Sequence, residues 1–369
     1  MGQAEIDAVR QVFDGHWLGL GRFTERFEES LRERVGARHV IAVNSGTAAL
    51  HLALQALDLA AGDEVLVPSL TFVSPVQMIL ASGARPVFCE VEPGTLNLDP
   101  DDVARRITPR TRAVLPVHYG GYACSLDPIL ALARERGLYA IDDAAHAFGS
   151  HYRGRPIGAW CDLTCFSFDP IKNITCVEGG AVATDNDEWA RQIRLRRNLG
   201  INADSWNRLE FARSWEYSVE APGFRYAMPN LNAAIGLAQL ARCDEFRRRK
   251  QEIVRQYDAE LGLVAGVTIL EKNIDDSFPF SYVIRVDPRR RDPLLAHLRQ
   301  AGIGAMVQFT PNHLQPRFRD PAVRLPVTES LYGEILTLPL YVEMTGAEVA
   351  EVIETVRRFL TGTGRHAHA

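Results

Sequence analysis

The chain has 369 residues, a hydrophobic fraction of 46%, a charged fraction of 24% and a formal net charge of -5. This composition is typical of a soluble globular protein, and the length predicts two domains or one large domain with a smaller lobe. The slightly acidic balance argues against nucleic acid or an anionic membrane as a partner. Any anionic ligand must therefore be held by a local site.

The cysteines and the amino terminus indicate the compartment. The six cysteines form no C-x-x-C pair, which predicts small buried side chains in a reducing compartment and no metal site. Residues 1–7 contain no basic region followed by an apolar run, and no apolar run of about eighteen residues occurs elsewhere. We therefore expect a cytoplasmic protein.

The first two thirds of the chain predict an α/β fold. Two helices, 6–13 and 23–35, are followed by short apolar strands that alternate with amphipathic helices. The expected strands are 39–43, 64–67, 86–91, 113–117, 140–143, 163–168 and 181–184, and the expected helices are 46–57, 74–81, 100–107, 127–136 and 186–199. This alternation predicts a mainly parallel sheet that is covered on both faces.

The last third predicts an arm and a smaller lobe. Residues 202–223 are rich in aromatic side chains without clear periodicity, which favours a functional arm over a disordered loop. Residues 231–261 read as one long helix, and we interpret its run 247–250 (R-R-R-K) as a solvated face, with a phosphate-binding patch as the alternative.

Beyond that helix, the pattern indicates an α+β lobe followed by a disordered tail at 361–369. The expected elements are strands at 281–286 and 305–308 and helices at 293–301 and 346–360. We expect a large domain at 1–240 and a small domain at 241–369.

One lysine carries the main chemical hypothesis. Lys172 follows an apolar strand, lies near Ser167 and Asn173, and precedes the pair Gly179-Gly180. A lysine after a strand is ordinarily a solvated surface group. Its neighbourhood here favours a Schiff-base lysine that binds an aldehyde cofactor.

A second cluster lies at the end of the strand 140–143. The carboxyl edge of a parallel sheet is where such folds bind ligands, and alternation allows only one of Asp142 and Asp143 to point there. Asp143 would pair with a pyridine nitrogen and keep it protonated, so that the ring acts as an electron sink. His146 would hydrogen-bond the phenolic oxygen of that ring, or else be a structural histidine.

A third cluster, Ser45-Gly46-Thr47-Ala48, begins a helix after a strand. The unpaired N–H groups of a first turn suit a phosphate, although the same residues also make an ordinary helix cap. Phe72 follows another strand end and would stack on an aromatic ring, with core packing as the alternative. Lysine, aspartate and phosphate loop together are what pyridoxal phosphate requires, so we expect this cofactor.

Several motifs resemble one known family over nearly the whole chain, from the Gly15-Trp17-Gly19 region onward. They are N-S-G-T-A-A-L-H-L-A-L, V-P-S-L-T-F-V-S, P-V-H-Y-G-G, I-D-D-A-A-H-A-F-G, S-F-x-x-x-K-N-x-T-x-x-E-G-G and L-P-L-Y. Together they resemble the DegT/DnrJ/EryC1/StrS sugar aminotransferases, which use pyridoxal phosphate to aminate keto groups of nucleotide-linked sugars. The resemblance implies the aspartate aminotransferase fold (fold type I) and a homodimer with shared active sites.

The resemblance also implies roles for individual residues. Lys172 matches the Schiff-base lysine and Asp143 the aspartate on the pyridine nitrogen. The phosphate ligands match Ser167, Thr47 and the Ala48 backbone; Phe72 matches the stacking aromatic residue and His146 the Gln or His near the phenolic oxygen. The segment 202–229 would cross to the partner subunit.

Two positions depart from the family pattern. Asp169 stands where many relatives have His or Tyr, which affects the sugar side of the site. Arg225 replaces the Asn that reaches the neighbouring subunit's phosphate, and Ala227 replaces an Arg. Arg225 can still donate to a phosphate as a cation.

We therefore expect an aminotransferase that transfers the amino group of glutamate to a keto sugar, most simply a nucleotide-linked 4-keto-6-deoxy hexose. Asp169 and the loop 308–313, including His313, are the expected sugar-side groups, with a structural role as the alternative for His313. An inositol-ketone aminotransferase is a further alternative. Lys172 argues against the family's dehydratases, which have His at that position, and the intact site residues argue against an inactive scaffold.

Overall fold

The computed structural model describes residues 1–202 and 216–362. Its centre is a seven-stranded sheet in the order β1-β9-β8-β5-β4-β2-β3. The strands are β1 (His39–Val43), β2 (Glu64–Pro68), β3 (Arg85–Cys89), β4 (Thr111–Val114), β5 (Tyr139–Asp143), β8 (Leu163–Ser167) and β9 (Gly180–Thr184). Only β9 runs antiparallel to its neighbours. This confirms the predicted α/β class with a mainly parallel sheet.

Helices cover both faces of this sheet. They are α2 (Arg22–Val35), α3 (Gly46–Ala56), α4 (Ser74–Ala81), α5 (Pro100–Arg106), α6 (Leu126–Arg136), α7 (Asp187–Arg196) and α9 (Asn230–Ala241), and α1 (Gln3–Asp14) packs on the outer side of α9. Successive residues of β1 enter different cores: Val40 belongs to the core that includes side chains of α2 and α6, whereas Ile41 belongs to the core that includes side chains of α3, α4 and α7. Alternation along a strand therefore places apolar side chains on both faces, as in a buried parallel sheet.

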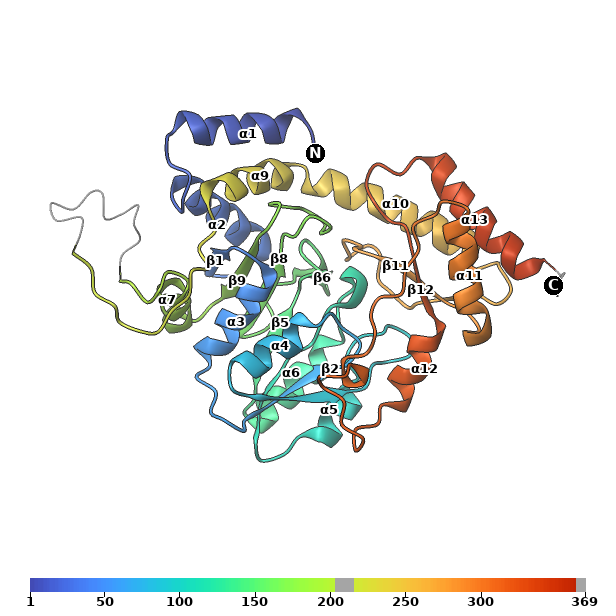
Figure 1. Ribbon diagram of the computed structural model, residues 1–369, viewed down its shortest axis with the longest axis horizontal. Helices are drawn as coiled ribbons and strands as arrows, with labels where there is room; N and C mark the ends of the chain where they lie inside the picture. Colours follow the sequence, from blue (N-terminus) through green and yellow to red (C-terminus); the bar gives the residue numbers. More distant parts are fainter. Residues whose placement is uncertain (203–215, 363–369) are drawn as a thin grey trace.

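The smaller lobe is built around a second sheet, with antiparallel strands in the order β10-β11-β12. Its elements are α10 (Cys243–Leu261), β10 (Thr268–Ile269), β11 (Tyr282–Arg285), α11 (Pro288–Gln300), α12 (Pro326–Glu334), β12 (Ile335–Leu338) and α13 (Gly346–Thr361). A hairpin of β6 (His151–Tyr152) and β7 (Arg155–Pro156) and two short 3-10 helices, η1 (Tyr119–Gly121) and η2 (Asn312–Leu314), complete the described elements. Figure 1 shows α9 and α10 running in succession from the large sheet to the small lobe.

Three details of the last third differ from the sequence-based expectations. The long helix is divided at Arg242 into α9 and α10, and the chain passes from one core to the other further along, between Phe246 and Ile253 of α10. The expected strand at 305–308 is reduced to one bridge, between Met306 and Thr337, and Phe309 beyond it packs between residues of the large domain and of the small lobe. Lys250, at the end of the basic run, is buried and not solvated.

Other expectations stay predictions. The domain boundary at 240/241 is one of them, because α10 contributes Phe246 to the core of the large sheet and Ile253 to that of the small lobe. Of the arm expected at 202–229, residues 203–215 lie outside the described residues, as do 363–369 of the tail. In the described part of the chain, every helix is too short or too polar to traverse a bilayer.

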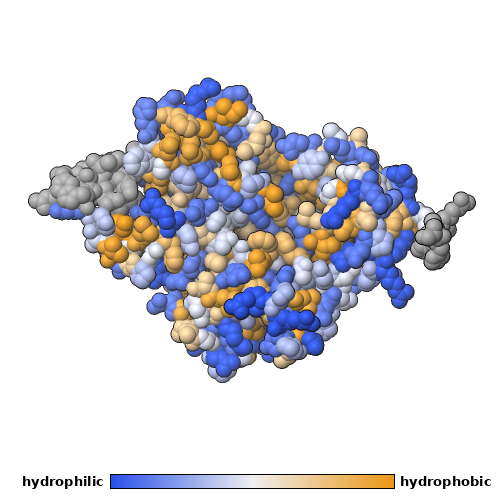
Figure 2. Space-filling model, in the orientation of Figure 1, coloured by the Kyte–Doolittle hydropathy of each residue, from blue (hydrophilic) through white to orange (hydrophobic). Residues whose placement is uncertain are grey.

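An apolar surface lies over α1 and α9. Figure 2 shows hydrophobic atoms gathered over α9, with more on α1. On α1, Ile6 is 56% exposed and Phe13 54% exposed. Clustered apolar side chains of this size are typical of surfaces that contact another protein.

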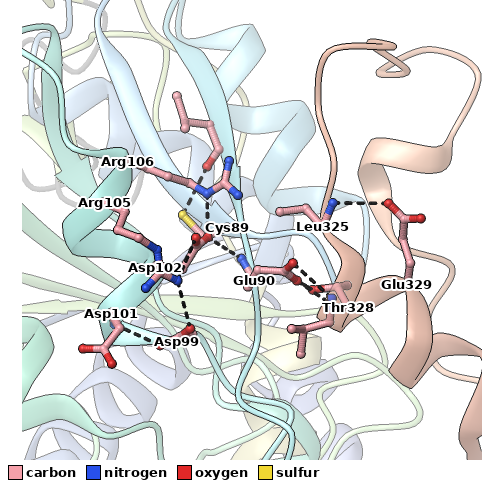
Figure 3. A network of polar contacts seen from close by, with 12 residues as sticks. Cys89, Glu90, Asp99, Asp101, Asp102, Arg105, Arg106, Leu325, Thr328 and Glu329 are labelled. Carbon is pink, nitrogen blue, oxygen red and sulfur yellow. Dashed lines mark hydrogen bonds and ion pairs between the residues drawn. The ribbon is translucent and has the colours of Figure 1, made fainter.

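A buried carboxylate joins the large sheet to α12 (Figure 3). Glu90, which is 6% exposed, accepts hydrogen bonds from the backbone N–H of Thr328 (2.8 Å) and Val327 (3.1 Å) and from the Thr328 hydroxyl (2.5 Å). Its own N–H donates to Asp102 at 2.8 Å. Glu90 thus caps the first turn of α12, where unpaired N–H groups favour an anion.

Replacing Glu90 should therefore weaken the joint between the lobes. We expect Glu90→Gln to lower the free energy of unfolding by about 1–3 kcal/mol, because its amide would turn a donor toward the N–H groups of α12. Thermal and urea unfolding of the purified protein would measure this. Asp101→Asn is the control, since this nearby exposed side chain lies outside the cap and should change stability by less than about 0.5 kcal/mol. Equal stability of the two variants would show that the cap contributes nothing.

Candidate active site

A cavity of about 200 Å³ lies at the carboxyl edge of the large sheet, against the small lobe. The side chains that line it follow the ends of β1, β2, β5 and β8, where open α/β sheets bind ligands. The lining residues used below are Gly46, Thr47, Phe72, Asp143, His146, Ser167, Asp169, Lys172, Glu178, Phe280, Gln308 and Phe309.

The first turn of α3 forms one end of the cavity. Gly46 packs directly against Ser167 from β8, and a Cβ at Gly46 would lie only 2.7 Å from the Ser167 Cβ. The Thr47 hydroxyl lies 2.9 Å from the Ser74 hydroxyl. Three hydroxyl groups thus surround N–H groups of a helix start, an arrangement that suits an anion. Ala48 does not line the cavity, and its N–H donates to the Ser45 hydroxyl at 3.1 Å.

The two aspartates of β5 point to opposite sides. Asp143 lines the cavity and accepts a hydrogen bond from the Ala145 N–H at 3.0 Å. Asp142 is fully buried on the other side, where an oxygen lies 2.9 Å from His118 Nε2. Burial raises the pKa of Asp143 to about 6, opposed by the Ala145 N–H and by Lys172. At neutral pH, Asp143 therefore presents a negative charge to the cavity.

Lys172 enters the cavity from the loop after β8. Its backbone N–H donates to the Asp169 carbonyl at 3.0 Å, and its Nζ lies 4.7 Å from the centre of the Phe280 ring. Burial lowers the pKa of the Lys172 amine, against the opposing effect of Asp143 and Asp169. A lysine with a lowered pKa has more of the neutral amine that attacks carbonyl groups.

His146 and Phe280 form an aromatic wall beside Lys172. Their rings are stacked, with centres 4.1 Å apart and an angle of 17° between the planes. Burial lowers the pKa of His146 well below its usual value, and Lys172 acts in the same direction, so the ring is neutral. Among the described residues, His146 Nδ1 has no hydrogen-bond partner. It is therefore available to a ligand atom.

Comparison with known proteins shows the family of this chain. The model of the DegT/DnrJ/EryC1/StrS aminotransferase family matches residues 1–357. The chain belongs to this family. A relative in Bacillus subtilis (strain 168), the spore coat polysaccharide biosynthesis protein SpsC, is 39% identical over 98% of this chain and 96% of its own.

Solved structures agree with this membership. The aminotransferase TlmJ from Streptoalloteichus hindustanus has a TM-score of 0.92 and 37% identity over 98% of this chain and 96% of its own. Spr1654 from Streptococcus pneumoniae, provisionally named a sugar aminotransferase, was solved in PLP and PMP forms. Its PMP form has a TM-score of 0.92 and 27% identity over 97% of each chain. The protein is thus a sugar aminotransferase of the DegT family and depends on pyridoxal phosphate.

The cavity of this DegT family member fits that cofactor. Buried Asp143 faces the cavity and would be the counter-charge for a protonated pyridine nitrogen, Lys172 would offer an amine of lowered pKa, and the free Nδ1 of His146 would meet a ring substituent. The turn at Gly46, Thr47 and Ser167 can hold the phosphate. Residues 45–47 and 167 would therefore hold one end of the cofactor, and Asp143 the other.

Of the remaining predicted residues, Phe72 and Asp169 line the cavity and Arg225 does not. Phe72 lines its wall, is 54% exposed and lies 5.8 Å from the Phe309 ring, measured between centres. Asp169 also lines it and accepts a hydrogen bond from the Ile171 N–H at 3.1 Å. Arg225 is exposed and does not line the cavity of its own subunit.

Only part of the expected sugar-side loop, residues 308–313, lines the cavity. Gln308 and Phe309 line the cavity, whereas Asn312 and His313 are buried beside Ser69. Asn312 donates to the Ser69 and Thr71 carbonyls, and His313 Nδ1 lies 2.7 Å from the Ser69 hydroxyl. His313 thus has the contacts of a structural residue, the alternative given for it above, and it does not line the cavity. Phe280 was missed, although the aromatic run Phe278-Pro279-Phe280 before a strand could have indicated it.

Proposed function

We propose that this sugar aminotransferase aminates the keto group of a nucleotide-linked 4-keto-6-deoxy hexose, with glutamate as the amino donor. The supporting observation is that the polar side chains of Asp169, Glu178 and Gln308 line the same cavity as Lys172. Carboxylate and amide groups exchange hydrogen bonds with sugar hydroxyls. A keto sugar can thus lie between these side chains and the reacting amine.

Four residues of the cavity have defined tasks in this proposal: Lys172, Asp143, His146 and Phe280. The bound cofactor supplies an electron sink for the carbanion formed at the substrate carbon. Lys172 binds the cofactor and, once displaced by the donor, moves a proton between the substrate carbon and the cofactor's C4′ carbon. Asp143 holds the proton on the ring nitrogen. His146 hydrogen-bonds the phenolic oxygen and, with Phe280, excludes water from one side of the cavity.

The proposal includes a homodimer with shared sites. Among the described residues that line the cavity, Asp143, Asp169 and Glu178 are acidic and only Lys172 is cationic. A cofactor phosphate and a nucleotide diphosphate need further positive charge. Exposed Arg225 of the partner subunit would supply it, and the apolar surface of α1 and α9 is a suitable contact for that subunit.

Hybrid dimers test the shared site. Mixing an inactive Lys172→Ala protein with an Arg225→Ala protein should restore about a quarter of wild-type activity, because half of the dimers would be hybrids with one intact site each. Turnover after verified subunit exchange measures this. Mixing Lys172→Ala with Asp143→Asn is the matched control and should restore nothing, because both residues belong to the same subunit's cavity. Equal outcomes for the two mixtures would place Arg225 outside the partner's site.

The acceptor is tested by spectroscopy. Glutamate should bleach the visible band of the lysine-bound cofactor, and the correct keto acceptor should restore it, with the aminated product seen by mass spectrometry. The panel contains thymidine-, uridine- and guanosine-linked 4-keto sugars, 3-keto sugars and inositol ketones. Recovery with only an inositol ketone would overturn the sugar nucleotide and leave the transamination intact. If no amino donor bleaches the band, the proposed half-reaction is wrong.

A further inference from the structure

The chain contains only three lysines, Lys172, Lys250 and Lys272, among 41 basic residues. None of the three is exposed, so the surface cations of the described residues are arginines. Lys250 follows three arginines on α10 and is 5% exposed, whereas Arg248 of the same run is exposed. The ammonium side chain of Lys250 is thus buried in the interior.

Lys250 reaches the residue that follows Lys172. Its Nζ donates to Asn173 Oδ1 at 2.9 Å, and Asn173 Nδ2 donates to the Phe278 carbonyl at 2.8 Å. These two contacts fix the orientation of the amide, since a flipped Asn173 would set N–H groups against the ammonium and an oxygen against the carbonyl. The loop that carries Lys172 is thereby joined to α10 on one side and to the segment before β11 on the other.

The same segment forms the wall of the active-site cavity. Phe278 lies two residues before Phe280, whose ring faces Lys172 Nζ and stacks on His146. Neighbouring residues of α10 hold it further: Arg247 donates to the Ser277 carbonyl at 3.2 Å and Gln251 to the same carbonyl at 2.8 Å. One turn of α10 thus holds both the Lys172 loop and the Phe280 wall.

The energetic balance argues against a purely structural role. Among the described residues, no carboxylate forms an ion pair with Lys250, and burial lowers its pKa to about 8, partly offset by Glu343. A buried ammonium without a carboxylate destabilises a fold, and a methionine of similar length would fill the space without that penalty. A group that is unfavourable for folding but contacts the active-site loop is expected to serve the site.

We propose that Lys250 is a positioning residue for Lys172: through Asn173 it fixes the active-site loop and couples the direction of the Lys172 amine to the position of the small lobe. The coupling follows from its place on α10, between Phe246 in the large-domain core and Ile253 in the small-lobe core. Movement of the lobe would move Asn173 and Phe278 together. This inference rests on Lys172 as the cofactor-binding lysine.

The test compares Lys250→Met with Arg248→Met in the full-length holoenzyme. Both remove one positive charge from α10, but Arg248 is exposed and donates to the Asp244 carbonyl at 3.4 Å. We expect Lys250→Met to lower kcat by about tenfold or more with a smaller change in KM, since loss of alignment acts on the chemical step. Arg248→Met should stay within about twofold of wild type.

A second readout does not depend on turnover. In cofactor-free protein, the rate at which an amine reagent labels Lys172 should change several-fold in Lys250→Met, and amide hydrogen exchange at residues 170–178 should speed up. The Lys250→Met/Asn173→Ala double variant should be no slower in turnover than Asn173→Ala alone, because both changes break one connection. Additive losses, or a lowered Tm with wild-type labelling and kcat, would overturn the proposal.

Two outcomes separate this inference from the assignment on which it rests. Borohydride reduction of the wild-type holoenzyme should attach the cofactor to Lys172; attachment to Lys250 or Lys272 would refute the assignment itself. Attachment to Lys172 with equal behaviour of Lys250→Met and Arg248→Met would refute the positioning role alone. If Lys250→Met does not fold, Asn173→Ala breaks the same contact, and wild-type labelling of Lys172 in that variant would count against the proposal.

Discussion

Lys172→Ala should abolish the covalent link to pyridoxal phosphate and reduce turnover by at least about 10²-fold to 10⁴-fold, the range typical of a removed general acid-base group. The physical reason is that the amine of Lys172 has a lowered pKa and lies in the same cavity as Asp143. Absorbance of the lysine-bound cofactor and single-turnover rates with glutamate measure both effects. The fold should persist, because Asp143 keeps the hydrogen bond from the Ala145 N–H when the amine is removed.

The chain has so few lysines that the cofactor-binding lysine can be identified directly. Borohydride followed by peptide mapping must distinguish only Lys172, Lys250 and Lys272. Lys272→Arg is the matched control, since Lys272 lies 2.8 Å from an Asp258 oxygen in the small lobe and Arg can keep that ion pair. It should retain the cofactor band. A retained band in Lys172→Ala would mean that another lysine binds the cofactor.

The sequence pattern around Asp143 and Lys172 predicted that these residues lie close together, because neighbouring parallel strands bring their carboxyl ends to one edge of the sheet. Asp143 ends β5 and Lys172 lies in the loop after β8. These strands are neighbours in the sheet, so two residues 29 positions apart in the sequence meet in one cavity. Alternation along β5 also separated Asp143 from Asp142, which lies beside His118. These relations depend on strand order and side-chain period, which the sequence carries directly.

Contacts between distant segments could not be predicted in this way. Phe280 reaches the cavity because the chain returns from the small lobe. The sequence around Phe280 does not indicate that its ring stacks on His146. The basic run of α10 resembles a solvated face, yet Lys250 is buried, donates to Asn173 and lies 5.9 Å from the centre of the Phe278 ring. Periodicity reports that one face of a helix is polar, but not whether another segment supplies the polar contacts.

Asp143→Asn should leave the cofactor bound and lower turnover by about 10²-fold to 10³-fold, comparable to the loss of one preorganised group at a developing charge. A neutral amide cannot keep the ring nitrogen protonated, so the electron sink is weakened. The ionised carboxylate is required, and wild-type activity should therefore fall as the pH drops through the pKa of Asp143. That pKa is about 6 in the cofactor-free protein, and a protonated ring would lower it further.

The same substitution should stabilise the cofactor-free protein at neutral pH. Because burial raises the pKa of Asp143 in the folded state, folding is disfavoured above about pH 6 and the penalty disappears as the pH falls toward 4. A rise of about two pKa units corresponds to at most about 3 kcal/mol, so Asp143→Asn should gain part of this at pH 7 and nothing near pH 4. Urea unfolding at the two pH values measures the difference.

Asp142→Asn is the matched control on the other side of β5. It should keep most of the turnover per folded subunit, because Asp142 does not line the cavity, but it should lose stability, because it contacts buried His118. The two aspartates are thus expected to give opposite results: Asp143→Asn more stable without cofactor and nearly inactive, Asp142→Asn less stable and active. If Asp142→Asn were the inactive variant, Asp142 would be the residue that holds the ring nitrogen's proton, and the assignment of the cavity-facing side of β5 would be wrong.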